Sequence, residues 1–297
     1  MRGFMQGVLA ADRHDDYLRA PDLDAAIAML ATGPCRILAG GTDVFPSLQD
    51  RPLMGRVLDI SGIADLRQIT QNDDHWSIGA AVSWRDVIRA ALPPAFDGLK
   101  AAARELGSWQ IQNRATLVGN ICNASPAADG VPALLTMDAA VQLQSCRGSR
   151  VMPLTSFITG NRKTKRADDE MVTAILVPTA ATAGQGYFYK LGARRYLVIS
   201  IGMVAMRLLC DSQQKIAEIA IAVGACSEVA TRLNDLEQHL CGQPLAGAAD
   251  ILSPSHFAGL SPIDDVRAPA SYRIDAVEES VRRLIAKAGF DIGHAKY

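Results

Sequence analysis

Two glycine-bearing polar stretches contain the residues best suited to binding an anion. The first is residues 39–43, AGGTD, where two consecutive glycines remove side-chain bulk beside a hydroxyl and a carboxylate. The second is residues 113–129, NRATLVGNICNASPAAD, where asparagine and serine follow Gly119 at close spacing. Backbone amides beside glycine can stay free to receive an anion, and hydroxyl and carboxamide groups add donors. Together, the two stretches could hold the two ends of one diphosphate.

Neither stretch has the form of the commonest phosphate-binding motifs. The sequence contains no GxxxxGK loop followed by Ser or Thr, and no GxGxxG fingerprint. A nucleotide site here would therefore be of another type. The alternative interpretation of residues 113–129 is a polar turn that joins two elements. For Asp129 alone, the alternative is the N-cap of a helix that starts at Gly130.

Short extended segments are expected to position both stretches. Residues 35–39 predict a strand before AGGTD, residues 44–48 a helical turn after it, and residues 57–60 a strand that completes a βαβ unit. In the second stretch, Thr116, Leu117 and Val118 are β-formers, so we expect an extended backbone that turns at Gly119 with positive φ.

The rest of the chain predicts an α+β fold in two domains. The first is residues 12–178, with lobes at about 12–60 and 61–178, and the small residues 179–186 form the boundary. The elements predicted in the first domain are a helix opening at Pro21 and Asp22, strands at 74–78, 139–144, 151–154 and 170–177, and helices at 83–91, 95–112 and 130–135. The second domain, residues 186–297, is expected to contain an antiparallel three-stranded sheet (186–190, 198–209, 216–223) and helices (229–241, 276–288).

Three motifs in this order carry a resemblance to a known family: AGGTD, TLVGNICNASPAAD (116–129) and FITGNRKT (157–164). They resemble the FAD-binding, or medium, subunit of the molybdenum hydroxylases, the relatives of xanthine dehydrogenase and carbon monoxide dehydrogenase. The resemblance extends from about residue 17 to the C-terminal helix and includes YKLGARRYLVISI (189–201) and ASYRIDAVEESVRRLI (270–285). It implies a two-lobed FAD-binding domain of the PCMH type followed by a smaller α+β domain. The sequence departs from the family pattern at Val118, often a glycine, and at Asn161, often an aromatic residue.

The resemblance also implies roles for particular residues. The FAD diphosphate would rest against the two glycine stretches, Asn123 and Asp129 would contact the flavin nucleotide, and Met171 or Val172 would lie near the flavin ring. Lys190 would lie close to the flavin, where a cation could stabilise negative charge on the reduced ring. The predicted cofactor-binding residues are Leu38, Ala39, Gly40, Gly41, Thr42, Asp43, Thr116, Gly119, Asn120, Asn123, Asp129, Met171, Val172 and Lys190. No catalytic side chain or metal ligand is predicted, because the flavin performs the redox chemistry.

Composition excludes several other classes of protein. A formal net charge of −1 offers no electrostatic footprint for nucleic acid or an anionic membrane. The six cysteines and five histidines are scattered, so we expect no iron-sulfur cluster in this chain and a cytoplasmic protein with buried thiols. Residues 1–11 do not read as a signal peptide. The longest apolar stretch, 196–206, is about half the ~20 residues that a membrane span needs.

The expected function follows from the resemblance. An FAD-binding electron-transfer subunit would accept electrons from a small [2Fe-2S] subunit, supplied by a large molybdopterin-binding subunit, and pass them to NAD or another acceptor. Two alternatives stay open: a self-contained FAD-dependent oxidase or dehydrogenase, for which the second domain looks small, and a non-enzymatic nucleotide-binding scaffold. The basic cluster Arg162, Lys163, Lys165 and Arg166 is either a solvated loop or a contact for a partner subunit or an NAD phosphate. The sequence indicates neither the substrate, the final acceptor nor the stoichiometry of the complex.

Overall fold

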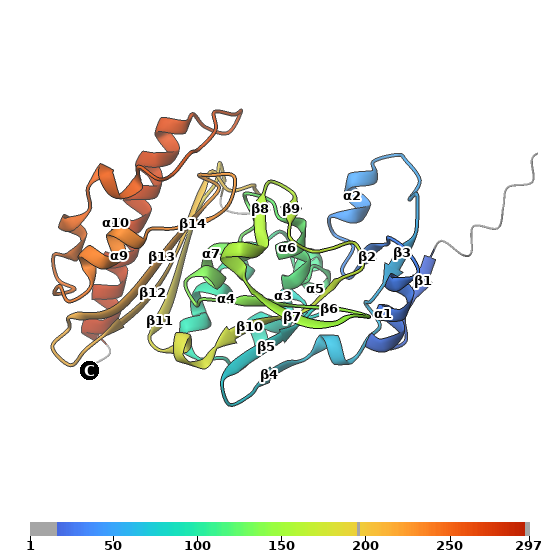
Figure 1. Cartoon of the computed structure of the whole chain (residues 1–297). Coiled ribbons are helices and arrows are strands. Elements are labelled where there is room, and N and C mark those ends of the chain that lie inside the picture. Colours follow the sequence, from blue (N-terminus) through green and yellow to red (C-terminus); the bar gives the residue numbers. More distant parts are fainter. Residues whose placement is uncertain (1–16, 195–196, 295–297) are drawn as a thin grey trace, which may run out of the picture.

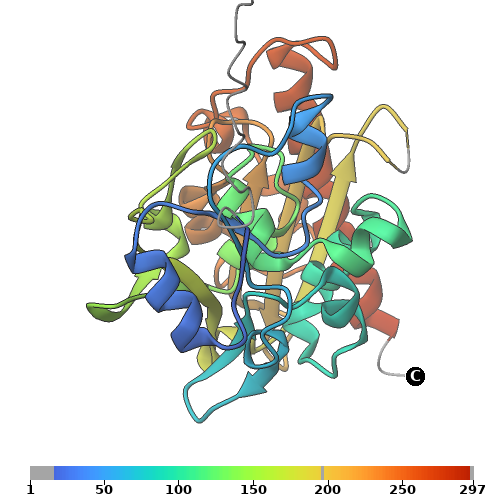
Figure 2. The ribbon, with the colours of Figure 1, turned by 90° about the vertical axis from the view of Figure 1, so that its right-hand side faces the viewer.

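The computed structural model describes residues 17–194 and 197–294 (Figure 1). Residues 1–11, the start of the predicted first domain (12–16) and the end of the predicted second domain (295–297) lie outside the described residues. Figure 1 shows three parts in a row, with a small N-terminal lobe at one end, a larger central lobe, and a sheet covered by helices at the other end. Figure 2 shows the molecule from the end where the N-terminal lobe lies.

The N-terminal lobe is a three-stranded parallel sheet with two helices. Its strands, in the spatial order β1-β3-β2, are β1 (Tyr17–Arg19), β2 (Arg36–Leu38) and β3 (Val57–Asp59). Helix α1 (Leu23–Ala31) begins where the Asp22 carboxylate accepts a hydrogen bond from the Ala25 amide at 2.8 Å. Helix α2 (Val44–Leu48) follows the first glycine stretch. The parallel pairing of β2 with β3 confirms the predicted βαβ unit.

The central lobe is built on a five-stranded antiparallel sheet in the order β4-β5-β10-β6-β7. The strands are β4 (Ile69–Gln71), β5 (His75–Gly79), β6 (Ala140–Ser145), β7 (Gly148–Pro153) and β10 (Met171–Pro178), with a separate hairpin of β8 (Ile158–Gly160) and β9 (Lys163–Thr164). The helices are α3 (Trp84–Arg89), α4 (Asp97–Glu105), α5 (Trp109–Arg114), α6 (Leu117–Asn123), α7 (Gly130–Leu135) and α8 (Leu154–Phe157). The predicted strands and the helices at 83–91 and 130–135 are confirmed. The predicted helix at 95–112 is instead divided into a 3-10 turn, α4 and α5.

The predicted strand at residues 116–118 is wrong, because this segment starts helix α6. The Thr116 side chain accepts a hydrogen bond from the Gly119 amide at 3.0 Å and forms the N-cap of the helix. Gly119 therefore lies inside the helix and does not turn the chain with positive φ. The capping hydroxyl and the contacts of the buried Leu117 and Val118 outweigh the weak β-preference of the three residues.

The C-terminal domain is a four-stranded antiparallel sheet in the order β11-β12-β13-β14, covered on one face by two helices (Figure 1). Its elements are β11 (Gln185–Leu191), β12 (Gly202–Cys210), β13 (Ile216–Gly224), β14 (Thr231–Arg232), α9 (Asn234–Leu240) and α10 (Ala270–His294). The three predicted strands are present. The fourth strand, β14, occupies the start of the segment predicted as a helix at 229–241, and α9 follows it.

Strand β12 separates two hydrophobic cores. Met203 and Ala205 belong to the core that extends through the central lobe, whereas Val204 and Met206 belong to the core beneath α9 and α10. Successive side chains of a strand point to opposite faces, so one strand serves both cores. Both faces of the C-terminal sheet are consequently buried, one by its own helices and one by the central lobe. Within the described residues, no helix combines the length and apolar character that crossing a bilayer requires.

Candidate functional site

A cavity of about 600 Å³ lies where the two lobes and the C-terminal domain meet. This volume is within the range of small-molecule and cofactor sites, ~300–1,000 Å³. The cavity is lined by every predicted site residue except Leu38, namely Ala39, Gly40, Gly41, Thr42, Asp43, Thr116, Gly119, Asn120, Asn123, Asp129, Met171, Val172 and Lys190. Leu38 is buried at the end of β2, where its carbonyl accepts a hydrogen bond from the Ile60 amide.

The first glycine stretch presents free backbone donors to the cavity. The amides of Gly40, Gly41 and Thr42, and the Thr42 hydroxyl, have no hydrogen-bond partner in the part of the chain that the structure describes. Gly41 takes φ 74°, a conformation that costs glycine little. Consecutive unpaired amides form a concave site for an anion. Residues 40–42 therefore present free donors on one side of the cavity.

The second glycine stretch contributes differently from the expectation. The Gly119 amide, predicted to be free, is occupied by the Thr116 hydroxyl. The Asn120 carboxamide oxygen accepts from the Gly130 amide at 3.3 Å, which leaves its nitrogen as a donor without a partner among the described residues. Helix α6 thus supplies side-chain donors to the cavity, and the free amides come from the other lobe.

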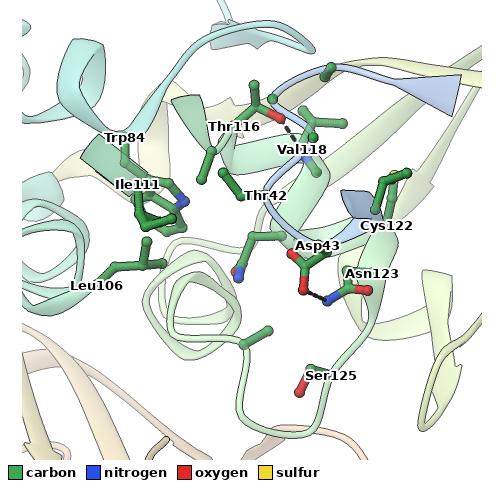
Figure 3. A pocket seen from close by; sticks show the side chains of 18 of the residues that line it. Thr42, Asp43, Trp84, Leu106, Ile111, Thr116, Val118, Cys122, Asn123 and Ser125 are labelled. Atoms are coloured by element: carbon green, nitrogen blue, oxygen red, sulfur yellow. Dashed lines mark hydrogen bonds between the residues drawn. The ribbon is translucent and has the colours of Figure 1, made fainter. Parts of the chain in front are cut away.

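Asn123 connects the two stretches across the cavity edge. Its nitrogen donates to the Asp43 carboxylate at 2.9 Å, as Figure 3 shows, and its oxygen accepts from the Arg162 guanidinium. Within the basic cluster, Arg162 and Arg166 line the cavity and the two lysines do not. Arg162, Lys163 and Lys165 are all exposed. Arg166 is held by backbone carbonyls of the following residues.

A buried ion pair, Asp129 with Lys190, lines the part of the cavity next to the C-terminal domain. The Asp129 carboxylate accepts from Lys190 Nζ at 2.7 Å and from Ser200 Oγ at 2.9 Å, and the two charged side chains are 8% and 5% exposed. Burial raises the pKa of Asp129, and the Lys190 charge opposes that rise. Asp129 occupies the N-cap position of α7, as the alternative interpretation expected, but its side chain makes no capping hydrogen bond and is used by the ion pair instead. Lys190 and Ser200 belong to the C-terminal domain, which therefore completes the cavity.

The remaining wall is apolar. Met171 and Val172 line it from the start of β10, next to a β-bulge between Val172 and Ala174, and both are buried. Sequence reasoning missed Ser200 and also the apolar lining residues Trp84, Leu106, Ile111, Val198 and Ile199. Ser200 interrupts the apolar run LVISIGMV, and that isolated hydroxyl is the one signal that could have indicated it. In the described residues, no three His, Cys, Asp or Glu side chains converge as metal ligands.

The sequence matches two protein families over most of its length. Residues 11–180 match the FAD binding domain in molybdopterin dehydrogenase, and residues 187–288 match the CO dehydrogenase flavoprotein C-terminal domain. The chain belongs to the molybdopterin dehydrogenase FAD-binding family. The predicted family, the α+β fold with a two-lobed FAD-binding domain and the assignment as an oxidoreductase subunit are thereby confirmed.

Relatives are similar over nearly the whole chain. A putative xanthine dehydrogenase FAD-binding subunit of Escherichia coli is 31% identical over 92% of this chain and 95% of its own length. The nicotine 6-hydroxylase medium subunit of Paenarthrobacter nicotinovorans is 28% identical over 92% of this chain and 96% of its own. A chain of the CO dehydrogenase from Oligotropha carboxidovorans shares the fold, with a TM-score of 0.83 at 24% identity, over 90% of this chain and 95% of that one.

The cavity residues fit an FAD molecule. Free amides, hydroxyls and carboxamides suit the oxygens of a diphosphate and of the attached sugars. The apolar wall at Met171, Val172, Ile111 and Trp84 suits an aromatic ring system. Buried cationic and anionic side chains at one end add a fixed charge pair beside it.

Proposed function

We propose that this chain is the FAD-binding electron-transfer subunit of a heteromeric molybdenum hydroxylase related to xanthine dehydrogenase. The observation that carries the proposal is the single cavity that combines the free amides of residues 40–42, an apolar wall and the buried Lys190–Asp129 pair. Bound FAD would supply the redox chemistry, so this chain binds, orients and shields it. The amides of 40–42 and the Thr42 hydroxyl receive the diphosphate, and Asn120 and Lys190 donate to the rest of the nucleotide.

The proposed partners are a large molybdopterin-binding subunit and a small [2Fe-2S] subunit, with NAD or another molecule as the final acceptor. The names of the relatives support a multisubunit arrangement, since they include the subunit alpha of a 6-hydroxypseudooxynicotine dehydrogenase complex. The exposed Lys165, beside the cavity, is the proposed contact for an acceptor phosphate or a partner. All six cysteines are free, which supports the proposed cytoplasmic location. The expectation of buried thiols is wrong for Cys146 and Cys241, which are exposed.

The substrate is proposed to be chosen by the partner subunits. The similar proteins carry names that refer to xanthine, nicotine, nicotinate and caffeine, although each is the FAD-binding, medium or another single subunit of its enzyme. A self-contained oxidase is disfavoured because both faces of the C-terminal sheet are already buried, which leaves that domain no face for a substrate pocket.

The test is the visible spectrum of the purified chain and the identity of any released chromophore. We expect flavin bands, with FAD released on denaturation. Thr42→Val should weaken FAD binding about tenfold, as expected for a hydrogen bond to a charged group. Thr70→Val, on the exposed strand β4, should leave binding unchanged. A colourless chain that takes up no FAD on reconstitution would favour the scaffold alternative.

Co-purification tests the subunit assignment. A tagged chain expressed with its neighbouring genes should retain a molybdenum-containing and an iron-sulfur-containing protein. Substrate oxidation by the isolated flavin-loaded chain, without these partners, would instead favour the self-contained oxidase.

A further inference from the structure

Three polar side chains form a bridge between the two lobes at the edge of the cavity. Asp43 belongs to the N-terminal lobe, Asn123 is the last residue of α6, and Arg162 lies at the turn of the β8–β9 hairpin. The Asn123 nitrogen donates to Asp43 Oδ1 at 2.9 Å (Figure 3), and the Asn123 oxygen accepts from Arg162 Nη1. We call Asp43, Asn123 and Arg162 the lobe bridge.

The two outer members fix the orientation of the middle one. A carboxylate can only accept hydrogen bonds and a guanidinium can only donate them, so the Asn123 carboxamide fits in one orientation. Arg162 forms no salt bridge among the described residues, and its guanidinium donates to this carboxamide. Its own backbone is anchored, because the Arg162 amide donates to the Ala124 carbonyl at 2.8 Å.

The bridge also governs where the Asp43 carboxylate lies. Asp43 directly follows the free amides of Gly40, Gly41 and Thr42, which form the proposed diphosphate site. A carboxylate released beside these amides would compete with a bound anion for them and repel it. The hydrogen bond from Asn123 holds the Asp43 carboxylate toward the central lobe.

We infer that Arg162 is a positioning residue of the cofactor site. By orienting Asn123, it keeps the Asp43 carboxylate away from the amides of residues 40–42 and ties the N-terminal lobe to the central lobe. The part of this inference that concerns the cofactor rests on the proposed FAD site. The part that concerns the two lobes does not.

The first experiment compares FAD release from the full-length chain in two matched variants. Arg162→Ala and Lys163→Ala each remove one positive charge from the same hairpin. Both side chains are exposed, but the Arg162 side chain donates to Asn123, whereas the Lys163 side chain makes no hydrogen bond among the described residues. Release is followed after dilution by flavin fluorescence. We expect about tenfold faster release from Arg162→Ala and less than a twofold change from Lys163→Ala. Equal effects of the two variants would overturn the inference, because they would reflect net charge alone.

A second pair of variants separates positioning from direct contact. If Arg162 acts through Asn123, the variant Arg162→Ala/Asn123→Ala should release FAD no faster than Asn123→Ala. If the Asp43 carboxylate is the group that Asn123 holds away from the amides, adding Asp43→Asn to Arg162→Ala should bring the rate of FAD release back to within about threefold of the parent rate. If the change in release rate in Arg162→Ala/Asn123→Ala equals the product of the changes in the two single variants, Arg162 contacts the cofactor directly and the inference is overturned.

A third measurement needs no flavin. The Phe45 and Ser47 amides at the start of α2 are bonded to the Gly41 and Asp43 carbonyls at 3.1 and 3.2 Å, so their hydrogen exchange reports on the anchoring of this segment. In flavin-free protein, Arg162→Ala should speed their exchange about tenfold, and Lys163→Ala should not. Unchanged exchange would overturn the inference. If the chain bound no FAD at all, the proposed function would fail, and this measurement would still decide whether the bridge anchors the lobe.

Discussion

The buried carboxylate of Asp129 depends on two donors from another domain. Lys190 and Ser200 occupy both of its oxygens, and none of the three side chains can reach bulk water readily. Removing one partner of a buried ion pair leaves an uncompensated charge, whereas replacing both can be nearly neutral. The pair therefore makes each of its members sensitive to single substitution, although the pair as a whole adds little stability.

Lys190→Met should lower the free energy of unfolding by about 3–5 kcal/mol, because it leaves the Asp129 charge buried without a partner. Adding Asp129→Leu should restore most of that loss without restoring flavin binding. Urea unfolding measures both. The exposed Lys163→Met is the control, with a change of about 0.5 kcal/mol or less. A mild effect of the single Lys190 variant would show that the pair is solvated.

A pH-dependent contribution is expected at Glu170. This buried carboxylate accepts two hydrogen bonds from the Arg150 guanidinium, at 2.6 and 2.7 Å, which lower its pKa. A lowered pKa means that the ionised form stabilises the fold above the unfolded pKa, ~4.3, and that this stabilisation is lost as the pH falls through the folded pKa. Glu170→Gln should therefore cost about 2 kcal/mol at pH 7 and progressively less below about pH 4.

The comparison variant for Glu170 is Asp169→Asn. Asp169 pairs with Arg147, whose side chain is 62% exposed, so this surface pair should contribute about 1 kcal/mol or less. Chemical denaturation of both variants at pH 7 and below pH 4 tests the assignment. A cost of Glu170→Gln that stays constant with pH would contradict it.

At the scale of elements, the sequence predicted those features that depend on local pattern. The strand before AGGTD, the helix opening at Asp22 and the apolar strands of both domains carry strong periodic or capping signals, and the structure confirms them. The strand predicted at residues 116–118 was wrong because a single capping hydroxyl, that of Thr116, outweighs the weak β-strand preference of these residues. The two-residue strand β14 is too short for any pattern to indicate.

The sequence predicted those cavity-lining residues that lie close together both in the sequence and in space. Residues 39–43 and the polar residues of 116–129 all line it, because each group belongs to one continuous stretch of chain. Ser200, Trp84 and Ile111 were missed because their side chains reach the cavity only through the packing of separate elements. The partly buried Arg150–Glu170 contact and the buried Asp129–Ser200 contact also join residues distant in sequence, which no local pattern reveals.

The close contact between the two lobes gives a test at a single glycine. A Cβ at Gly40 would lie 1.9 Å from the Arg114 carbonyl oxygen, which is backbone and cannot rotate away. Gly40→Ala should therefore push the lobes apart, cost about 3 kcal/mol and weaken flavin binding. Gly289→Ala, in α10 with no atom within 4 Å of the added carbon, should instead raise stability by about 0.5–1 kcal/mol. Thermal unfolding of the two variants should shift in opposite directions.

At the scale of the whole molecule, the buried Arg207 and the partly buried Arg232 join the C-terminal sheet to the central lobe. Arg207 of β12 donates to the carbonyls of Thr136 and Ala183 and pairs with Glu218. Arg232 of β14 donates to the Leu135 carbonyl. These contacts satisfy backbone groups that the domain junction would otherwise bury without partners.

Arg207→Met should cost about 3 kcal/mol, because it leaves the Thr136 and Ala183 carbonyls unsatisfied. The loss falls on the junction, so differential scanning calorimetry should resolve two transitions where the parent chain shows one. Glu218→Gln is the control, since the Glu218 side chain is 49% exposed and its removal should cost less than about 1 kcal/mol. A single cooperative transition in Arg207→Met would contradict a junction role for Arg207.

The placement of Lys190 and Ser200 in the cavity wall has a consequence for biosynthesis. The ribosome delivers residues 39–43 first and Ser200 much later, roughly 10–30 s later at ordinary rates of synthesis. Until the C-terminal sheet has folded onto the central lobe, the part of the cavity wall formed by Lys190 and Ser200 is missing, and Asp129 lacks both of its side-chain partners. We therefore expect nucleotide loading to follow synthesis of the C-terminal sheet, and a chain that ends before Lys190 lacks this part of the cavity wall.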